Sequence, residues 1–155
     1  MCGIVGLYDP YINREILVNK INKANKIQSH RGPDDSGFYL DQSSNFCHGM
    51  TRLAILGLKD GTQPFFSNDK RYSLVFNGEI INFPQLKKYL ISKGIQLKTK
   101  NSDTEVLLEL LILEKESAIK MLNGMFFKLL FILPSGIIFL PTRFRCFLDT
   151  IIALF

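Results

Sequence analysis

The stretch from Leu129 to Leu140 most constrains how this chain can fold, because it is almost entirely apolar. A helix needs roughly 20 apolar residues to span a bilayer, and this stretch is shorter and is interrupted by Pro134-Ser135-Gly136. Proline and glycine mark turns, and short apolar runs beside a turn are typical of buried strands. The sequence therefore predicts two buried strands joined at the Pro-Ser-Gly turn.

Period and turn signals predict the other elements of what is expected to be one domain. Apolar residues recur at a helical period between Arg14 and Ile27, namely at Ile16, Leu17, Ile21, Ala24 and Ile27. Apolar runs bounded by turn residues predict strands over residues 3–8, 38–40, 46–56 and 72–76. Helix-start signals predict helices over residues 84–93, 102–114 and 118–122. Strands with helices grouped between them indicate an α+β layered domain.

Composition and charge exclude some classes of protein. The chain is 46% hydrophobic and 21% charged, which excludes a purely disordered chain. The net charge is +5, but the lysines lie among acids along the expected helices, and no run of like charge stands out. The excess charge is therefore interpreted as a solvated surface, and nucleic-acid binding is not expected.

The cysteines and the N-terminus indicate a reducing environment. Cys2, Cys47 and Cys146 are odd in number and widely spaced, which argues against a disulfide framework or a zinc site. No basic leader precedes an apolar segment at the start of the chain, so no signal peptide is expected. The predicted location is the cytoplasm.

Cys2 is the first candidate for chemistry. Its small size lets the initiator Met1 be removed, which leaves a thiol and a free α-amine on one residue. An α-amine has a pKa of roughly 7.7–8.0, close to the working pH of a general base. One residue then provides both nucleophile and base. Cys2 alone does not establish this chemistry, since a cysteine also occurs at position two by chance.

Three other segments carry polar residues that permit a functional or a structural interpretation. Asn77-Gly78 follows an apolar strand and either donates two hydrogen bonds to an oxyanion or forms an ordinary turn. Arg52 has apolar neighbours. It either has a structural role, paired or with its charged end extended to solvent, or it binds a carboxylate with its planar guanidinium. Asp103 either caps the helix it begins or holds an ammonium group.

These segments, taken together and in order, resemble the N-terminal glutaminase domain of glutamine-hydrolysing asparagine synthetases. The matching segments cover residues 1 to about 126 and are Met1-Cys2-Gly3-Ile4-Val5-Gly6, His30-Arg31-Gly32-Pro33-Asp34-Asp35-Ser36-Gly37, Arg52-Leu53-Ala54-Ile55, Phe76-Asn77-Gly78-Glu79-Ile80-Ile81-Asn82-Phe83, Ser102-Asp103-Thr104-Glu105 and Leu122-Asn123-Gly124-Met125-Phe126. The resemblance implies an α+β fold, the four-layer αββα sandwich of N-terminal-nucleophile hydrolases, incomplete at its C-terminal end. Amidotransferases that serve a sugar phosphate are the alternative family.

The resemblance also implies a role for each site residue. Cys2 would attack the side-chain amide of glutamine, and the Asn77 side chain and Gly78 backbone would form the oxyanion hole. The residues expected to bind the substrate are Arg52 at its α-carboxylate, Asp103 and Glu79 at its α-ammonium, and the backbone of Ile55 and Leu56 along the pocket. No metal or cofactor is expected in this domain. His30 and His48 are expected to be structural.

The resemblance ends after residue 126. Residues 127–155 form an apolar tail that departs from the family, and we interpret it as the product of a frameshift, which the nucleotide sequence would test. The synthetase domain, which would bind ATP and Mg²⁺ and accept the ammonia, is expected to be missing from this chain. Hypotheses that remain are an active glutaminase, an inactive fragment or a remnant that binds glutamine or a partner, and, least favoured, a membrane-associated protein.

Overall fold

The computed structural model describes residues 2–41, 45–54, 61–133 and 136–141. Residues 142–155, the last part of the tail that we interpret as the product of a frameshift, lie outside this range. The elements, in chain order, are β1 (Gly3–Tyr8), α1 (Arg14–Ile27), a 3₁₀ turn η1 (Ser29–Arg31), β2 (Asp35–Leu40), β3 (Phe46–Arg52), β4 (Phe65–Phe66), β5 (Ser73–Ile80), α2 (Phe83–Ser92), α3 (Asp103–Glu114), η2 (Lys115–Ser117), α4 (Ala118–Met121), β6 (Gly124–Leu133) and β7 (Gly136–Pro141).

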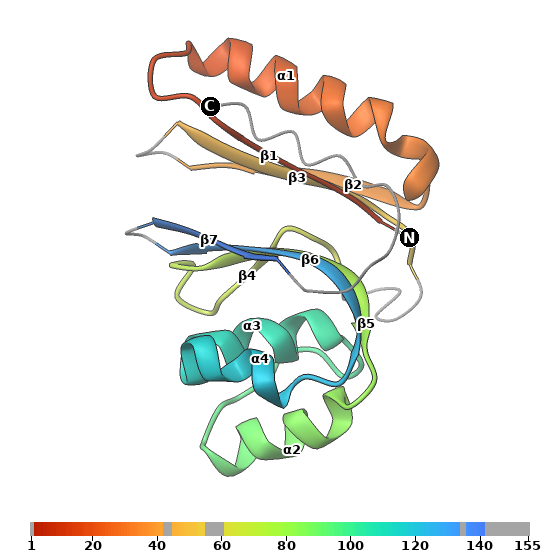
Figure 1. Cartoon of the computed structure of the whole chain (residues 1–155), viewed down its shortest axis with the longest axis vertical. Helices are drawn as coiled ribbons and strands as arrows, with labels where there is room; N and C mark the ends of the chain where they lie inside the picture. Colours follow the sequence, from red (N-terminus) through yellow and green to blue (C-terminus); the bar gives the residue numbers. More distant parts are fainter. Residues whose placement is uncertain (1, 42–44, 55–60, 134–135, 142–155) are drawn as a thin grey trace.

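The elements form four layers, two of them antiparallel sheets. One sheet has the strand order β1-β3-β2, and the other has the order β4-β5-β6-β7. Helix α1 covers the outer face of the first sheet, and α2, α3 and α4 lie beyond the second, as Figure 1 shows. The expected α+β fold with an αββα sandwich is therefore confirmed.

The apolar stretch near the C-terminus forms the predicted strand pair. β6 and β7 are antiparallel, with Leu133 opposite Gly136 across the turn. β5 runs to Ile80 rather than ending at Phe76, because β6 pairs with it as far as the Ile80–Gly124 pair. The strand expected over residues 46–56 ends at Arg52.

Helix α1 begins and packs as its sequence dictates, with one difference. Its N-cap is Asn13, whose Oδ1 accepts a hydrogen bond from the Glu15 N–H at 2.8 Å. Leu17 and Ile21 are buried as predicted, but Ile16 and Ile27 are exposed. In the last turns of the helix, Asn25 is the buried residue instead. Asn25 fits because Gly49 of β3 lies beneath it without a side chain, and its Nδ2 donates to the Gly37 carbonyl at 3.0 Å.

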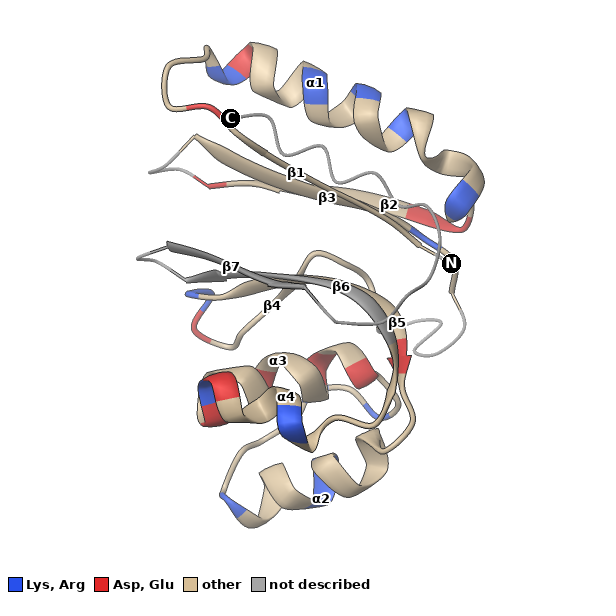
Figure 2. Ribbon diagram, in the orientation of Figure 1, with Lys and Arg blue, Asp and Glu red and all other residues tan. Residues whose placement is uncertain are grey.

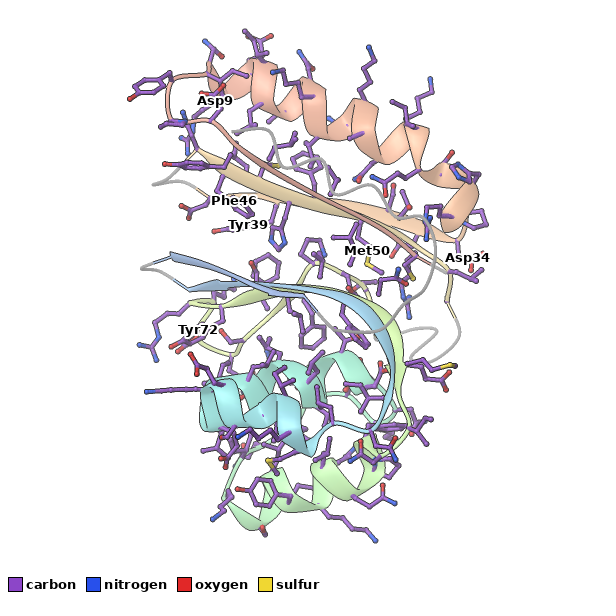
Figure 3. All side chains as sticks on the ribbon, viewed as in Figure 1. Asp9, Asp34, Tyr39, Phe46, Met50 and Tyr72 are labelled. Atoms are coloured by element: carbon purple, nitrogen blue, oxygen red, sulfur yellow. The ribbon has the colours of Figure 1, made fainter. Side chains whose placement is uncertain are left out.

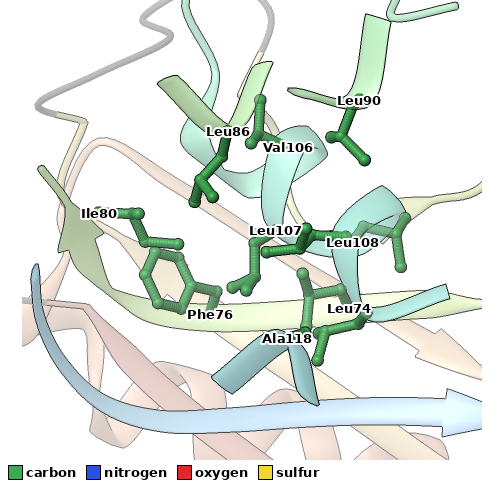
Figure 4. Packing of buried hydrophobic residues seen from close by; sticks show 11 residues of the cluster. Leu74, Phe76, Ile80, Leu86, Leu90, Val106, Leu107, Leu108 and Ala118 are labelled. Atoms are coloured by element: carbon green, nitrogen blue, oxygen red, sulfur yellow. The ribbon is translucent and has the colours of Figure 1, made fainter. Parts of the chain in front are cut away.

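The larger core lies under the second sheet. Helix α3 is apolar on almost every side, and it is buried because it packs on β5 while α2 packs on it. Figure 4 shows the side chains that meet there, Leu74, Phe76 and Ile80 from β5, Leu86 and Leu90 from α2, Val106, Leu107 and Leu108 from α3, and Ala118 from α4. This packing fixes the start of α3 beside the end of β5.

A thinner apolar layer lies between the two sheets. Phe46, Met50 and Val75 form its buried centre, and Cys2 and Ile4 pack against it. In Figure 3 the side chains of Tyr39, Phe46 and Met50 point into this space. Side chains on a strand alternate between its faces, so Cys2 and Ile4 of the β1 segment share the face that meets the second sheet.

Charged residues are distributed unevenly between the outer layers. Figure 2 shows Lys and Arg along α1, whereas Asp and Glu predominate on α3. The expectation that the lysines lie among acids along the helices is therefore wrong for α1, where Glu15 is the single acid. The expected lack of nucleic-acid binding stays a prediction.

Candidate active site

Cys2 lies just before β1, at the edge of the apolar layer between the sheets. Its half-buried Sγ accepts a hydrogen bond from the Leu53 N–H at 3.3 Å and lies 3.7 Å from the Leu53 carbonyl oxygen. Its own carbonyl accepts from Nε of Arg31 at 3.4 Å. The segment that follows β3 therefore contacts the thiol, and η1 contacts the backbone of the same residue.

The backbone nitrogen of Cys2 connects the two sheets. It donates to Oδ1 of Asn77 on β5 at 3.1 Å, and the Asn77 side chain is 5% exposed. Because Oδ1 accepts this bond, the two N–H donors of the same amide lie on its other atom, Nδ2. The geometry thus joins a thiol, the nitrogen of the same residue and an amide donor.

The pairing of β5 and β6 shifts at the site. Asn77 lies opposite Lys128 but Gly78 lies opposite Phe126, so Phe127 is an extra residue on β6. Such bulges bend a strand and change the direction of its side chains, and they occur often beside active sites. Gly124 sits close by, where a Cβ would come within 2.2 Å of the Glu79 carbonyl oxygen, so only glycine fits at the start of β6.

Arg52 ends β3 and is 6% exposed. The turn after η1 crosses its backbone closely: a Cβ on Gly32 would lie 2.5 Å from the Arg52 nitrogen. The Asp34 N–H donates to the Arg52 carbonyl at 3.1 Å. The turn after η1 therefore fixes the position at which Arg52 leaves the sheet.

Asp103 begins α3 and is 6% exposed. Its Oδ2 accepts from the Ile80 N–H at 3.2 Å, which ties the helix start to the end of β5. Burial raises the pKa of the Asp103 carboxyl above its ordinary value, while the hydrogen bonds from Ile80 and Thr104 work in the opposite direction. Ser102, the residue directly before α3, makes no side-chain capping bond.

Contacts in the structure connect most of the predicted site residues. Cys2 contacts Leu53, which follows Arg52, and Asn77, which precedes Gly78 and Glu79. Asp103 joins the same strand through Ile80. The predicted pocket residues Ile55 and Leu56 lie outside the described part of the chain.

Sequence reasoning missed two residues that organise this site. The Asp34 carboxylate accepts from the Ala54 N–H at 2.8 Å, and Gln63 binds both β5 and α3. Asp34 belongs to the matched segment from His30 to Gly37, but its partner lies 20 residues further along the chain. No local pattern marks Gln63.

Each of the two histidines lies beside a hydrogen-bonding atom. Nδ1 of exposed His30 lies 3.0 Å from the Ile27 carbonyl, and Nε2 of buried His48 lies 3.0 Å from Oγ of Ser73. Among the described residues, no three His, Cys, Asp or Glu side chains are grouped as metal ligands. In the same part of the chain, no helix has the length and apolar character needed to cross a bilayer.

Comparison with known proteins places the chain in a family. A family model described as a glutamine amidotransferase domain matches residues 1–139. Asparagine synthetase [glutamine-hydrolyzing] 1 of Bacillus subtilis is 39% identical over 128 residues, covering 81% of this chain and 20% of that protein. Putative asparagine synthetase 2 of Methanocaldococcus jannaschii is 36% identical over 156 residues, covering 90% and 29%. Asparagine synthetase B of Escherichia coli is 33% identical over 126 residues, covering 81% and 22%.

A solved structure supports the fold. Glutamine phosphoribosylpyrophosphate amidotransferase of B. subtilis, complexed with ADP and GMP, matches 85% of this chain and 34% of its own with a TM-score of 0.53 and 24% identity. The chain thus spans between a fifth and about a third of the length of these relatives. The expected boundary at residue 126 stays a prediction. The chain belongs to the glutamine amidotransferase domain family, and its matches correspond to that domain of glutamine-hydrolysing asparagine synthetases.

Proposed function

We propose that this chain hydrolyses glutamine to glutamate and ammonia, with Cys2 as the N-terminal nucleophile. The observation that carries the proposal is the 3.1 Å bond from the Cys2 nitrogen to Oδ1 of Asn77. Removal of Met1 converts this amide nitrogen into an α-amine. The amine, the Sγ atom and an amide donor then lie together at one edge of the layer between the sheets.

The proposed reaction begins when the α-amine takes the thiol proton and Sγ attacks the side-chain carbonyl carbon of glutamine. The carbonyl oxygen becomes an oxyanion, which Nδ2 of Asn77 and the Gly78 N–H stabilise by hydrogen bonds. The intermediate collapses, the carbon–nitrogen bond breaks, and the protonated amine gives its proton to the departing ammonia. Water then attacks the thioester, which releases glutamate and restores the thiol.

The proposed specificity rests on two buried charges of opposite sign. Arg52 would bind the α-carboxylate with its planar guanidinium, and Asp103 would bind the α-ammonium with help from Glu79. Each of the two principal side chains is 6% exposed. Burial, which raises the Asp103 pKa, makes a cationic partner favourable there. The backbone of Ile55 and Leu56 would complete the pocket.

In a longer parent protein, we propose, the ammonia passes to a synthetase domain that uses ATP and Mg²⁺ to make asparagine. The relatives that carry this activity in their names are three to five times longer than the matched segment. A nucleophilic thiol also requires a reducing compartment, which supports the cytoplasm. A sugar-phosphate acceptor is the alternative.

An electrophilic ketone analogue of glutamine tests the proposal. The analogue should add one label to Cys2, detected by mass spectrometry of peptides, and excess glutamine should slow the labelling. Cys47 serves as the internal control because it is buried, and burial raises its pKa to about 12. Labelling that is absent, or that glutamine does not slow, would support the inactive fragment instead.

A further inference from the structure

Gln63 precedes β4, and its side chain joins two elements that carry site residues. Its Oε1 accepts from the Phe76 N–H at 2.7 Å, and its Nε2 donates to Oγ1 of Thr104 at 3.3 Å. Phe76 immediately precedes Asn77 on β5, and Thr104 immediately follows Asp103 on α3. The primary amide accepts at one atom and donates at the other, as this position requires.

On the β5 side, the Gln63 side chain supplies a hydrogen-bond acceptor where no neighbouring strand in the described part of the chain does so. β4 pairs with β5 only at Phe65–Leu74 and Phe66–Ser73, so the Phe76 N–H lies beyond that ladder. Phe76 is buried, and a buried N–H without an acceptor is costly. The Gln63 side chain supplies the acceptor and thereby fixes the strand directly before Asn77.

On the α3 side, the direction of the hydrogen bond matters. A threonine hydroxyl has one proton. Because Oγ1 of Thr104 accepts from Gln63, its own proton is left for Oδ1 of Asp103, 3.5 Å away. The other carboxylate oxygen of Asp103 accepts from Ile80. Gln63 thus sets the orientation of the hydroxyl that faces the carboxylate.

The backbone of Gln63 is held by the other sheet. A Cβ on Gly37 of β2 would come within 2.5 Å of the Gln63 carbonyl oxygen, so the two segments touch without a side chain between them. Gln63 therefore contacts β2 of the first sheet, β5 of the second sheet and helix α3, which packs on β5.

We propose that Gln63 is a positioning residue that aligns Asn77 for catalysis through Phe76 and aligns Asp103 for substrate binding through Thr104. This inference rests on the proposed function, because Asn77 and Asp103 have their roles only there. A purely structural role would change stability and scale all kinetic constants together. If Gln63 positions both residues, loss of one of its two hydrogen bonds should change kcat and KM by different factors.

Two substitutions separate the two sides. Gln63→Glu keeps an acceptor for Phe76 but has no donor, so the Thr104 hydroxyl turns toward the new carboxylate and leaves Asp103. KM for glutamine should rise about tenfold while kcat stays within about twofold, as expected for one lost bond to a charged group. Gln63→Met removes both bonds, so kcat should fall as well. Gln85→Glu, at an exposed position of α2, controls for added charge.

The Thr104→Val background isolates the relay. With no hydroxyl to redirect, Gln63→Glu should change KM much less there than in the unsubstituted chain, and Thr104→Ser should restore the larger change. Two other acids lie near Asp103: Glu79, which precedes its bonding partner Ile80 on β5, and Glu105 on α3. Neither is changed in any of these variants. Equal effects in the two backgrounds would overturn the inference.

A titration of Asp103 tests its link to Gln63 without any measurement of enzymatic turnover. The carboxyl carbon of Asp103, followed by NMR, should titrate at higher pH in Gln63→Glu, and by more than in the Thr104→Val background. Equal shifts in the two backgrounds would contradict the relay. If the unsubstituted chain releases no glutamate, the proposed function fails, yet this titration still decides what Gln63 does to Asp103.

Discussion

The carboxylate of Asp34 accepts the backbone N–H of Ala54 at 2.8 Å. Ala54 follows Leu53, whose own N–H donates to Sγ of Cys2. The turn after η1 therefore holds the segment that contacts the nucleophile, although neither Asp34 nor Ala54 touches Cys2 in any contact described here.

This relationship predicts a positioning effect. Asp34→Ala should lower the rate of glutamine hydrolysis by about threefold to tenfold, because a hydrogen bond of this kind contributes about 1 kcal/mol and tenfold corresponds to about 1.4 kcal/mol. Asp34→Asn keeps an acceptor and should retain most of the rate. The control is Asp35→Ala, since Oδ1 of Asp35 accepts only from the adjacent Ser36 N–H among the bonds described. An equal loss in both alanine variants would refute the effect.

Asn77 should have a larger effect than Asp34. Replacing it with alanine removes the side-chain oxyanion donor, so kcat should fall by about 10²–10³, with a smaller change in KM. Asn77→Asp keeps the acceptor for the Cys2 nitrogen but loses the donors, and should be at least as impaired. Asn22→Ala, at an exposed position of α1, should leave kcat unchanged. Near-normal kcat in Asn77→Ala would remove Asn77 from the oxyanion hole.

The contact between Gly32 and Arg52 predicts a cost in stability. Gly32→Ala places a Cβ 2.5 Å from backbone atoms of Arg52, so the turn must shift. The free energy of unfolding should drop by about 1–3 kcal/mol in urea denaturation, as for other overpacking substitutions. Ser29→Ala, exposed in the same turn, should stay within about 0.5 kcal/mol. A Gly32 variant as stable as the Ser29 variant would contradict the close approach.

His48 predicts how stability depends on pH. Burial lowers its pKa from 6.5 to about 3, so between these values the unfolded chain binds a proton that the folded chain does not. Stability therefore falls as the pH decreases through this window, by about 1.4 kcal/mol per unit from this residue. Unfolding free energies between pH 7 and 4 should show a shallower slope in His48→Gln than in the exposed-site control His30→Gln. Equal slopes would show that His48 does not contribute.

How much could be predicted from the sequence depends on the range of the interactions. The β6–β7 pair and the stripe Leu17–Ile21 follow from local pattern, and the structure confirms them. Burial of Asn25 could not be predicted, because it depends on Gly49, which lies beneath the helix only in the folded sheet. The end of β5 at Ile80 likewise depends on pairing with β6.

The candidate site divides in the same way. Motif order predicts roles for Cys2 and Asn77, because the family resemblance carries residue identity along the chain. It could not give the partners Leu53 or Ile80, since those bonds come from the meeting of segments about 51 and 23 residues apart. Gln63 escaped notice because its two hydrogen bonds join elements that are adjacent only in space.

The most direct test of the central claim compares two forms of the same chain, one with Met1 removed and one with Met1 retained, each verified by intact mass. Glutamate released from glutamine is measured for both forms and for Cys2→Ala. Release is expected only from the form whose Cys2 amine is free, and none above background from the other two. Equal release with Met1 retained, or release that survives Cys2→Ala, would contradict the assignment of Cys2 as both nucleophile and base.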